Sequence, residues 1–487
     1  MTSEPHAAAT GLFPPGEPML TEAEAAAILD TARAVIADIG IEVPDDRQRE
    51  RVLVHWGRAN GRRITFPRDE MDVYLAEWRE RNGFGEPGYH SETPWPLSSD
   101  TVLGLSVMPY SHTYLDPRSD QHLPLTASRL IEAARFLGTL ADDAVDATVP
   151  GHPVDVPPGL QPLAEYRTGA QYNPQGGGYG WTGPPATAEH LFRMAELMGR
   201  PITTAVVYVF SPLRLGGAEL ETAMAFRHSL RAVHVSNMGA CGGSFPLNPK
   251  TALALSWAET IAGAMCVAAL TDLPTNWGGS VEPFDLRAQT IPFGAPEQTL
   301  FYRLSRDAGC WIRGGRPAGG HAPLLTMAKR PGAQASLEKT AAAAFAVASG
   351  CTSLGAAGSL SADEVFSPTQ VLLDMELRDW LQRASRGIAL APDAHDDALR
   401  TIREGLAHGS FTTSDETLDR YRELYWFPKH LRREMLGRWQ ALGRPEAVED
   451  ARREAVERIE GATWVLPEPQ FSQLEGIYEE ARRRLSS

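Results

Sequence analysis

Aromatic side chains set among glycines are the residues of this sequence best suited to binding chemistry. The stretch QYNPQGGGYGWTGPP, residues 171–185, places Tyr179 and Trp181 in such surroundings. From Gly178 onward the glycines also have the G-x-G-x-x-G spacing of a loop that binds dinucleotide phosphates. The two prolines that follow remove N–H donors where the helix of that motif would begin, and no acidic residue ends the next predicted strand. We therefore interpret the stretch as a loop whose rings line a binding site.

Further rings stand near the ends of other predicted strands. Aromatic faces that converge with few opposed charges favour a cation without exchangeable protons, such as a quaternary ammonium, and each well-placed ring contributes roughly 0.5–2 kcal/mol. The alternative is that most of these rings belong to the core or stack on a sugar. The residues expected to form the cation site are Tyr110, Tyr179, Trp181, Tyr208 and Trp277.

An alternation of short apolar runs and helical segments from about residue 100 onward must position these rings. Such alternation predicts parallel strands joined by crossover helices. About eight units favour a (β/α)8 TIM barrel over an open doubly wound sheet, and the carboxyl ends of barrel strands converge on one mouth. The predicted strands cover residues 103–108, 144–149, 168–172, 202–210, 232–237, 273–279, 310–315 and 351–356.

The barrel is predicted to be flanked by helical regions. Residues 1–98 are expected to form a helical N-terminal region, 99–378 the barrel and 379–487 a helical C-terminal extension. Thr21 followed by Glu24 has the spacing of a capping box, which marks the start of the first helix.

Composition excludes several classes of function. The 487 residues carry a net charge of -15, which argues against nucleic-acid binding. No basic stretch followed by an apolar one opens the chain, so no signal peptide is expected. The apolar run 251–270 contains Glu259 and is interpreted as a buried helix, not a membrane span. Widely separated cysteines predict core thiols in a reducing cytoplasm; they are Cys241, Cys266, Cys310 and Cys351.

Longer segments resemble one enzyme family. ILDTARAVIADIGIEVP, MGACGGSFPLNPKTALALSWAETIAG and FTTSDETLDRYRELYWFPKHLRRE are similar, in order and spacing, to segments of the trimethylamine methyltransferase family of corrinoid-dependent enzymes. The resemblance implies a TIM barrel that moves a methyl group from a methylated amine to the cobalt of a separate corrinoid protein. The corrinoid (cobalamin) is expected on that partner, because this sequence has no D-x-H-x-x-G motif. A homo-oligomer is also expected.

One segment points to a subgroup of that family. The archaeal trimethylamine enzymes carry pyrrolysine in a segment resembling T-D-A-(pyrrolysine)-V-P-D-A-Q-A, where residues 326–335 here read TMAKRPGAQA. Lys329 stands at the pyrrolysine position, and both acidic residues are missing. The chain thus resembles non-pyrrolysine members such as glycine betaine methyltransferases. Glu259 and Glu338 also recur in the family pattern, and we expect each to be buried beside a hydrogen-bonding or ion-pairing partner.

The implied chemistry needs no general acid in the protein. A quaternary ammonium loses its methyl group and leaves as a neutral tertiary amine, so the protein must mainly bind the cation, exclude water and aim one methyl. Arg316 or His321 would hold the carboxylate of a betaine. Two alternatives remain: a lyase or hydrolase that uses His321, or Lys329 as a Schiff-base lysine, and a non-catalytic binder of methylated amines.

Overall fold

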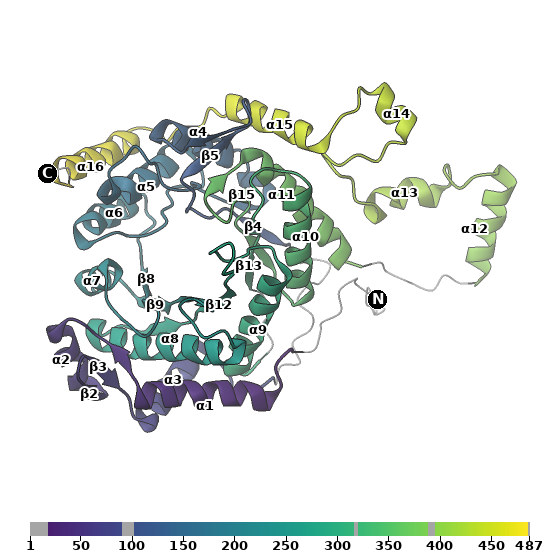
Figure 1. The fold of residues 1–487 in the computed structure, drawn as a ribbon. Coiled ribbons are helices and arrows are strands. Elements are labelled where there is room, and N and C mark those ends of the chain that lie inside the picture. The colour runs from purple at the N-terminus through teal and green to yellow at the C-terminus, as the bar shows by residue number, and fades with distance from the viewer. Residues whose placement is uncertain (1–17, 90–101, 316–319, 388–394, 486–487) are drawn as a thin grey trace, which may run out of the picture.

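The computed structural model describes residues 18–89, 102–315, 320–387 and 395–485. Helices and strands alternate along most of this chain, which confirms the α/β class. Figure 1 looks along the strands and shows a ring of helices around them.

The N-terminal region combines helices with a small sheet. The first helix starts at the predicted capping box, since the Thr21 side chain accepts from the Glu24 N–H and the Glu24 side chain accepts from the Thr21 N–H. This helix packs along the long apolar helix α8. The elements are α1 (Glu22–Asp38), β1 (Ile41–Glu42), α2 (Asp46–His55), β2 (Arg58–Asn60), β3 (Arg63–Thr65) and α3 (Arg68–Asn82), with antiparallel strand order β1-β3-β2.

The central strands are parallel and fall into two sheets. One has the order β13-β14-β4-β7 and the other β11-β9-β8. Among the described residues, hydrogen bonds do not join these sheets into a closed barrel. The strands are β4 (Gly104–Ser106), β7 (Val145–Asp146), β8 (Thr204–Tyr208), β9 (Ala232–Ser236), β11 (Thr275–Trp277), β13 (His321–Pro323) and β14 (Ser353–Gly355).

A helix follows each of these strands, as the alternation predicts. Buried residues alternate along β8 and β9, so one face of each strand packs against the surrounding helices and the other faces the interior of the ring. The helices are α4 (Ala127–Gly138), α5 (Gln161–Tyr172), α6 (Pro185–Leu197), α7 (Ala218–Ala225), α8 (Pro249–Thr271), α9 (Pro296–Ile312), α10 (Ala333–Ala348) and α11 (Pro368–Ser385), with single turns at 141–143 and 158–160.

Two of the predicted strands are wrong. Residues 168–172 lie in α5, and residues 310–312 of the predicted strand 310–315 lie in α9. Both segments are rich in small or buried residues, and α5 is buried on nearly every side, so the helical period is not visible in its polarity. The residues after α5 lie next to the end of β7, where the predicted strand was expected. Asn173 Nδ2 donates there to the Ala147 carbonyl at 2.8 Å.

Short strands lie beyond the carboxyl ends of the central strands and lengthen the loops there. One group has the order β15-β16-β5-β6, and β10 pairs with β12. They are β5 (Thr113–Asp116), β6 (Gln121–Pro124), β10 (Met238–Cys241), β12 (Ser280–Pro283), β15 (Ser359–Leu360) and β16 (Val365–Phe366).

The helix α8 is the one described segment long and apolar enough to cross a membrane, and 89% of its most apolar window is buried inside the protein. It lies between the central strands and α1, in contact with both. The prediction of a buried helix is confirmed.

The C-terminal part is helical, as predicted. Two of its helices return to the ring, since α15 packs on α11 and α4 and α16 packs on α5 and α6, whereas α12 and α13 project away from it. The division at residues 98 and 378 stays a prediction, and residue 378 falls within α11. The helices are α12 (His395–His408), α13 (Asp415–Leu424), α14 (Leu436–Ala441), α15 (Ala447–Gly461) and α16 (Gln470–Leu485).

Candidate functional site at the carboxyl ends of the strands

Two of the predicted rings meet at the carboxyl edge of the parallel strands. Tyr208 is the last residue of β8, and Tyr110 follows β4. Burial and, to a lesser extent, the hydrogen-bonding Tyr208 phenol together raise the pKa of Tyr110 to about 12. Both rings remain 38–47% exposed, so a ligand in the mouth can reach them. The structure therefore brings together residues that are 98 positions apart in the sequence.

The glycine-rich loop passes directly beside this pair. A Cβ at Gly180 would lie 2.8 Å from the Pro109 carbonyl oxygen, 2.9 Å from His152 Cε1 and 3.5 Å from Tyr110 Cδ1. The loop backbone can pack this closely only because Gly180 has no side chain. Tyr179 and Trp181, both partly buried, flank Gly180 in the sequence.

The other glycines of the loop are explained by close packing. A Cβ at Gly178 would lie 1.7 Å from Thr148 Oγ1, and one at Gly177 would lie 2.8 Å from the Tyr166 ring. The Tyr179 ring lies 6.4 Å from Tyr166, and burial raises the pKa of its phenol. The G-x-G-x-x-G spacing thus fits the loop against the chain after β7 and against α5, in keeping with the rejection of a dinucleotide site.

A pair formed by the partly exposed His152 and the buried Glu165 lies near Tyr110 and was not predicted from the sequence. Glu165 is fully buried; it accepts from His152 Nδ1 at 2.6 Å and from the Gly180 N–H at 2.9 Å. Burial raises the pKa of Glu165, which the two hydrogen bonds only partly oppose. Burial disfavours the charged form of His152, but the hydrogen bond and charge of Glu165, helped by Asp363, leave the pKa of His152 raised. The pair therefore retains a proton near Tyr110.

Asp363 adds a second carboxyl group to this cluster. Burial raises its pKa, while His112 and His152 act in the opposite direction. Its backbone carbonyl accepts from the Ser111 hydroxyl at 2.7 Å, which ties the loop after β15 to the residue that follows Tyr110. The position of His152 just after the predicted strand 144–149 is the sequence signal that could have placed it at the site. Glu165, 13 residues later, has no such signal.

Trp277 does not lie with the other rings. In β11 it pairs with Val235, whereas Tyr208 pairs with Ser236, and successive side chains in a strand point to opposite faces. The Trp277 ring is 3% exposed and lies 4.9 Å from that of Trp78 and 6.2 Å from that of Trp257. It packs in the helix layer, so the expected cation site lacks this ring.

His321, one of the two residues expected to hold a carboxylate, lies apart from the tyrosines. His321 is the first residue of β13, at the amino end of the strand, whereas Tyr208 lies at a carboxyl end. Its Nδ1 lies 3.3 Å from Ser353 Oγ, and burial lowers its pKa. It lines a cavity of about 280 Å³ shared with Trp277 and Arg313. Arg316 lies outside the described residues.

Lys329 is exposed. Its Nζ donates to the Met327 carbonyl at 2.8 Å, and its own carbonyl accepts from His122 Nε2 at 2.8 Å. These contacts fit a surface lysine and give no support to a Schiff-base role.

The two glutamates of the family pattern accept hydrogen bonds that hold backbone segments in place. Glu259 accepts from Asn237 Nδ2 at 2.6 Å, from the Leu213 N–H at 2.7 Å and from the Ser211 hydroxyl at 2.8 Å. Glu338 accepts from the Met327 N–H at 2.9 Å and from the Thr326 hydroxyl. Glu259 therefore fixes the loop after β8, and Glu338 fixes the segment that carries Lys329.

The four cysteines are buried and unpaired, and burial raises the thiol pKa of Cys241 to about 11 and of Cys310 to about 12. Among the residues that the structure describes, no three His, Cys, Asp or Glu side chains are grouped so as to hold a metal ion.

Comparison with known proteins identifies relatives of this chain. The model of the trimethylamine methyltransferase family (MTTB) matches residues 187–466. Trimethylamine methyltransferase MttB of Desulfitobacterium hafniense is 26% identical over 298 residues, which cover 58% of this chain and 57% of the relative. The Methanosarcina barkeri MttB is 27% identical over 252 residues, covering 51% and 49% respectively. The chain spans about half the length of the curated relatives it matches.

Among solved structures, the Methanosarcina barkeri monomethylamine methyltransferase MtmB aligns over 92% of this chain and 93% of its own, with a TM-score of 0.38 and 10% identity. The family match begins at residue 187, so it includes Tyr208 but none of Tyr110, His152, Glu165 and Tyr179.

Proposed function

Because the chain belongs to the trimethylamine methyltransferase family, we propose that it transfers a methyl group from a methylated amine to the cobalt of a corrinoid carried by a separate protein. The observation that supports this most directly is the Tyr110–Tyr208 pair near the buried Glu165, at the edge where the strands of such folds bind ligands. We further propose that the two parallel sheets close into a (β/α)8 barrel in the working enzyme, and that it acts in the cytoplasm.

The site suits a cationic methylated amine. The faces of Tyr110 and Tyr208 attract a cation through their ring quadrupoles, and Tyr179 and Trp181 extend the aromatic surface along the loop. An ionised Asp363 near the rings adds to this attraction, and so does the His152–Glu165 pair once it has lost its shared proton. We therefore propose a quaternary amine as the substrate, with glycine betaine as the first candidate.

The protein's task in this proposal is to bind, orient and exclude water. The bond between nitrogen and the methyl carbon breaks with its electron pair left on nitrogen, so a quaternary substrate departs as a neutral tertiary amine. The new bond to the methyl carbon uses an electron pair of Co(I) in the acceptor. No proton transfer is required, so Tyr110 and Tyr208 serve to aim one methyl group outward, where the acceptor docks.

The test is spectroscopic. The purified protein is mixed with cob(I)alamin and, separately, with glycine betaine, carnitine, choline or trimethylamine, and the appearance of methylcobalamin is followed by absorbance. We expect a substrate-dependent rise with at least one quaternary amine and a much smaller one with Tyr208→Ala. No rise with any of these amines, with free cob(I)alamin or with a reduced corrinoid protein, would count against the proposal.

The two alternative functions, a non-catalytic amine binder and a lyase or hydrolase, predict different results. A non-catalytic binder would bind an amine in calorimetry without forming methylcobalamin. Borohydride trapping of a carbonyl substrate on Lys329 would indicate the lyase instead.

A further inference from the structure

The helices α12 and α13 form an arm, residues 395–424, that projects from the body of the protein (Figure 1). Neither helix makes an extensive contact with any other described helix or strand. The arm is joined to the body by side-chain contacts such as Arg383 Nε, which donates to the Leu424 carbonyl at 3.2 Å. Its end therefore stands in solvent.

The arm exposes apolar residues in helical stripes. Ile402 and Leu406 are four residues apart on α12, and Leu418 and Tyr421 are three apart on α13, so each pair lies on one helix face. The exposed fractions are 49% for Ile402, 73% for Leu406, 45% for Phe411, 67% for Leu418, 45% for Tyr421 and 40% for Leu424. Tyr425 and Phe427 continue this surface at 56% and 51%.

Such an arm is not stable by itself. Isolated helices shorter than about 12–15 residues are marginal in water, and most helical stability comes from packing of the apolar face. The helices have 14 and 10 residues and bury little within their own chain. Half-exposed aromatic and aliphatic side chains of this number offer on the order of 800 Å², the area that each partner buries in a standard protein interface. The apolar face thus needs a partner surface.

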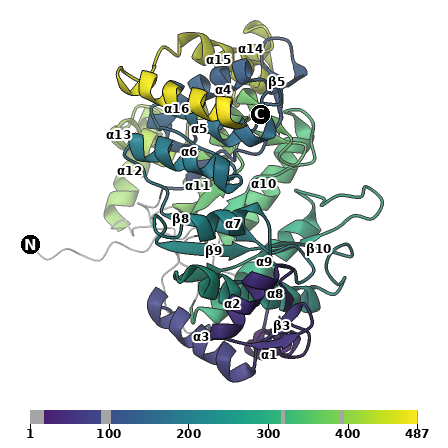
Figure 2. The same ribbon diagram turned by 90° about the vertical axis from the view of Figure 1, so that its left-hand side faces the viewer.

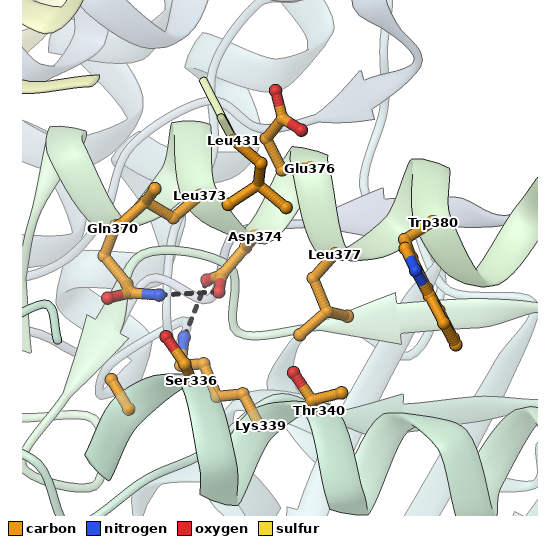
Figure 3. Close-up of a pocket in the computed structure, with 11 residues that line it drawn as sticks. Ser336, Lys339, Thr340, Gln370, Leu373, Asp374, Glu376, Leu377, Trp380 and Leu431 are labelled. Carbon is orange, nitrogen blue, oxygen red and sulfur yellow. Dashed lines mark hydrogen bonds and ion pairs between the residues drawn. The ribbon is translucent and has the colours of Figure 1, made fainter. Parts of the chain in front are cut away.

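We propose that the arm of one chain docks on the α10–α11 face of a second copy. A cavity of about 260 Å³ lies between these helices, with Leu373, Leu377 and Trp380 of α11 and Leu431 on its walls (Figure 3). Leu337 and Phe345 of α10, which are 72% and 63% exposed, lie on the face of that helix turned away from the cavity. The apolar walls of the cavity therefore form the receiving surface.

The charged pair at the base of that cavity is already satisfied. Lys339 Nζ donates to Asp374 at 2.6 Å, and the same carboxylate accepts from Gln370 Nε2 and from the Gly358 N–H, each at 2.8 Å (Figure 3). Because Lys339 and Asp374 pair with each other, an apolar side chain can enter the cavity without separating this ion pair. Gln370 Oε1 and Glu376 Oε2 in the lining have no hydrogen-bond partner among the described residues, so they can accept from polar groups of the docking arm.

Charge and position favour a second copy as the partner. The arm carries seven Asp and Glu against four Arg, a net charge of -3, whereas residues 428–446, which border the cavity through Leu431, carry five Lys and Arg against two Glu, a net charge of +3. Arm and receiving surface lie on the same side of the chain, so a two-fold axis can bring each arm to the other chain's surface. Figure 2 shows α12 and α13 on the side of the molecule opposite β10, away from the mouth where the methyl acceptor would dock.

The first test measures self-association by sedimentation at micromolar concentrations. The wild type is expected to sediment as a multiple of the 53.0 kDa chain. A Leu406→Glu and Leu418→Glu double variant is expected to weaken association at least tenfold. Leu286→Glu, at a residue 68% exposed outside the arm and comparable to Leu418 at 67%, is the control and should leave association unchanged. Circular dichroism checks that each variant is folded.

The second test locates the contact. A Leu406→Cys chain is mixed with a differently tagged Thr340→Cys chain, whose new cysteine lies in the cavity lining, and treated with a short bis-maleimide; the four native cysteines are buried, so background labelling is low. A cross-link between the two tagged chains is the expected result. A monomer at every concentration, equal weakening by Leu286→Glu, or cross-linking only within a chain that carries both cysteines would overturn the proposal.

Discussion

The mouth of the strands is built from two regions that hold carboxyl groups in different ways. Within residues 187–466, which match the family, Glu259 accepts only from an amide, a hydroxyl and a backbone N–H, none of which titrates in the physiological range. Before residue 187, Glu165 is hydrogen-bonded to His152, and a histidine side chain titrates in the physiological range. The first carboxyl fixes a backbone, and the second shares a proton with its histidine. Under the proposed function, the region before residue 187 would contribute a proton-sharing group to the site that the matched region does not supply through Glu259.

The largest effect is expected where the fixed carboxyl is removed. Glu259→Ala removes the acceptor of two buried donors and of the partly buried Ser211 hydroxyl, and leaving a buried donor unsatisfied costs about 1–3 kcal/mol. We expect the free energy of unfolding in denaturant to fall by roughly 3 kcal/mol or more, and Glu259→Gln, which keeps one acceptor oxygen, to lose less. Equal stability of the wild type and Glu259→Ala would show that the two regions do not differ in this way.

Removal of either exposed ring should impair binding without unfolding the protein. Tyr110→Ala and Tyr208→Ala each delete one aromatic face, which we expect to lower kcat/KM for the amine roughly tenfold, about 1.4 kcal/mol. The loss should appear mainly in KM, and the melting temperature should change little because both rings are partly exposed. If only the Tyr208 variant is impaired, the upstream region does not contribute to the site.

The proton held by the His152–Glu165 pair predicts a pH dependence. Because the pKa of His152 is raised above its ordinary 6.5, its contribution to stability is complete below pH 6.5 and is lost as the pH rises through the raised value. Loss of the proton leaves the pair with negative charge, so the affinity for a cationic amine should rise over the same interval. His152→Gln should flatten both the unfolding and the binding profiles. An unchanged binding profile would place the pair outside the site.

The smallest effect on amine binding is expected at Trp277. Its ring packs on Trp78 and Trp257 behind the sheet, so Trp277→Phe should leave KM for the amine within twofold of the wild type, while the cavity left by the smaller ring should cost about 1–3 kcal/mol of stability. Steady-state kinetics alongside the tyrosine variants provides the comparison. A tenfold rise in KM would instead return this residue to the cation site.

Sequence patterns predicted the features that depend on local order. The capping box at Thr21 starts α1, and most of the strand–helix alternation is correct. The helix at 168–172 was missed because α5 is buried on most sides and shows no polar face. The side to which Trp277 points depends on strand register, and the contact of His152 with Glu165 depends on how the loop after β7 returns over α5. Neither can be read from spacing along the chain.

A Cβ at Gly178 would lie 1.7 Å from Thr148 Oγ1, so the loop packs tightly against the segment after β7 of the same chain. This packing, and not a bound amine, determines the path of the loop that carries Tyr179 and Trp181. Tyr179 and Trp181 are thus in position before a substrate arrives. Binding of a ligand therefore requires little ordering of this loop. Association should be rapid and should show a single kinetic phase, without a slow rearrangement.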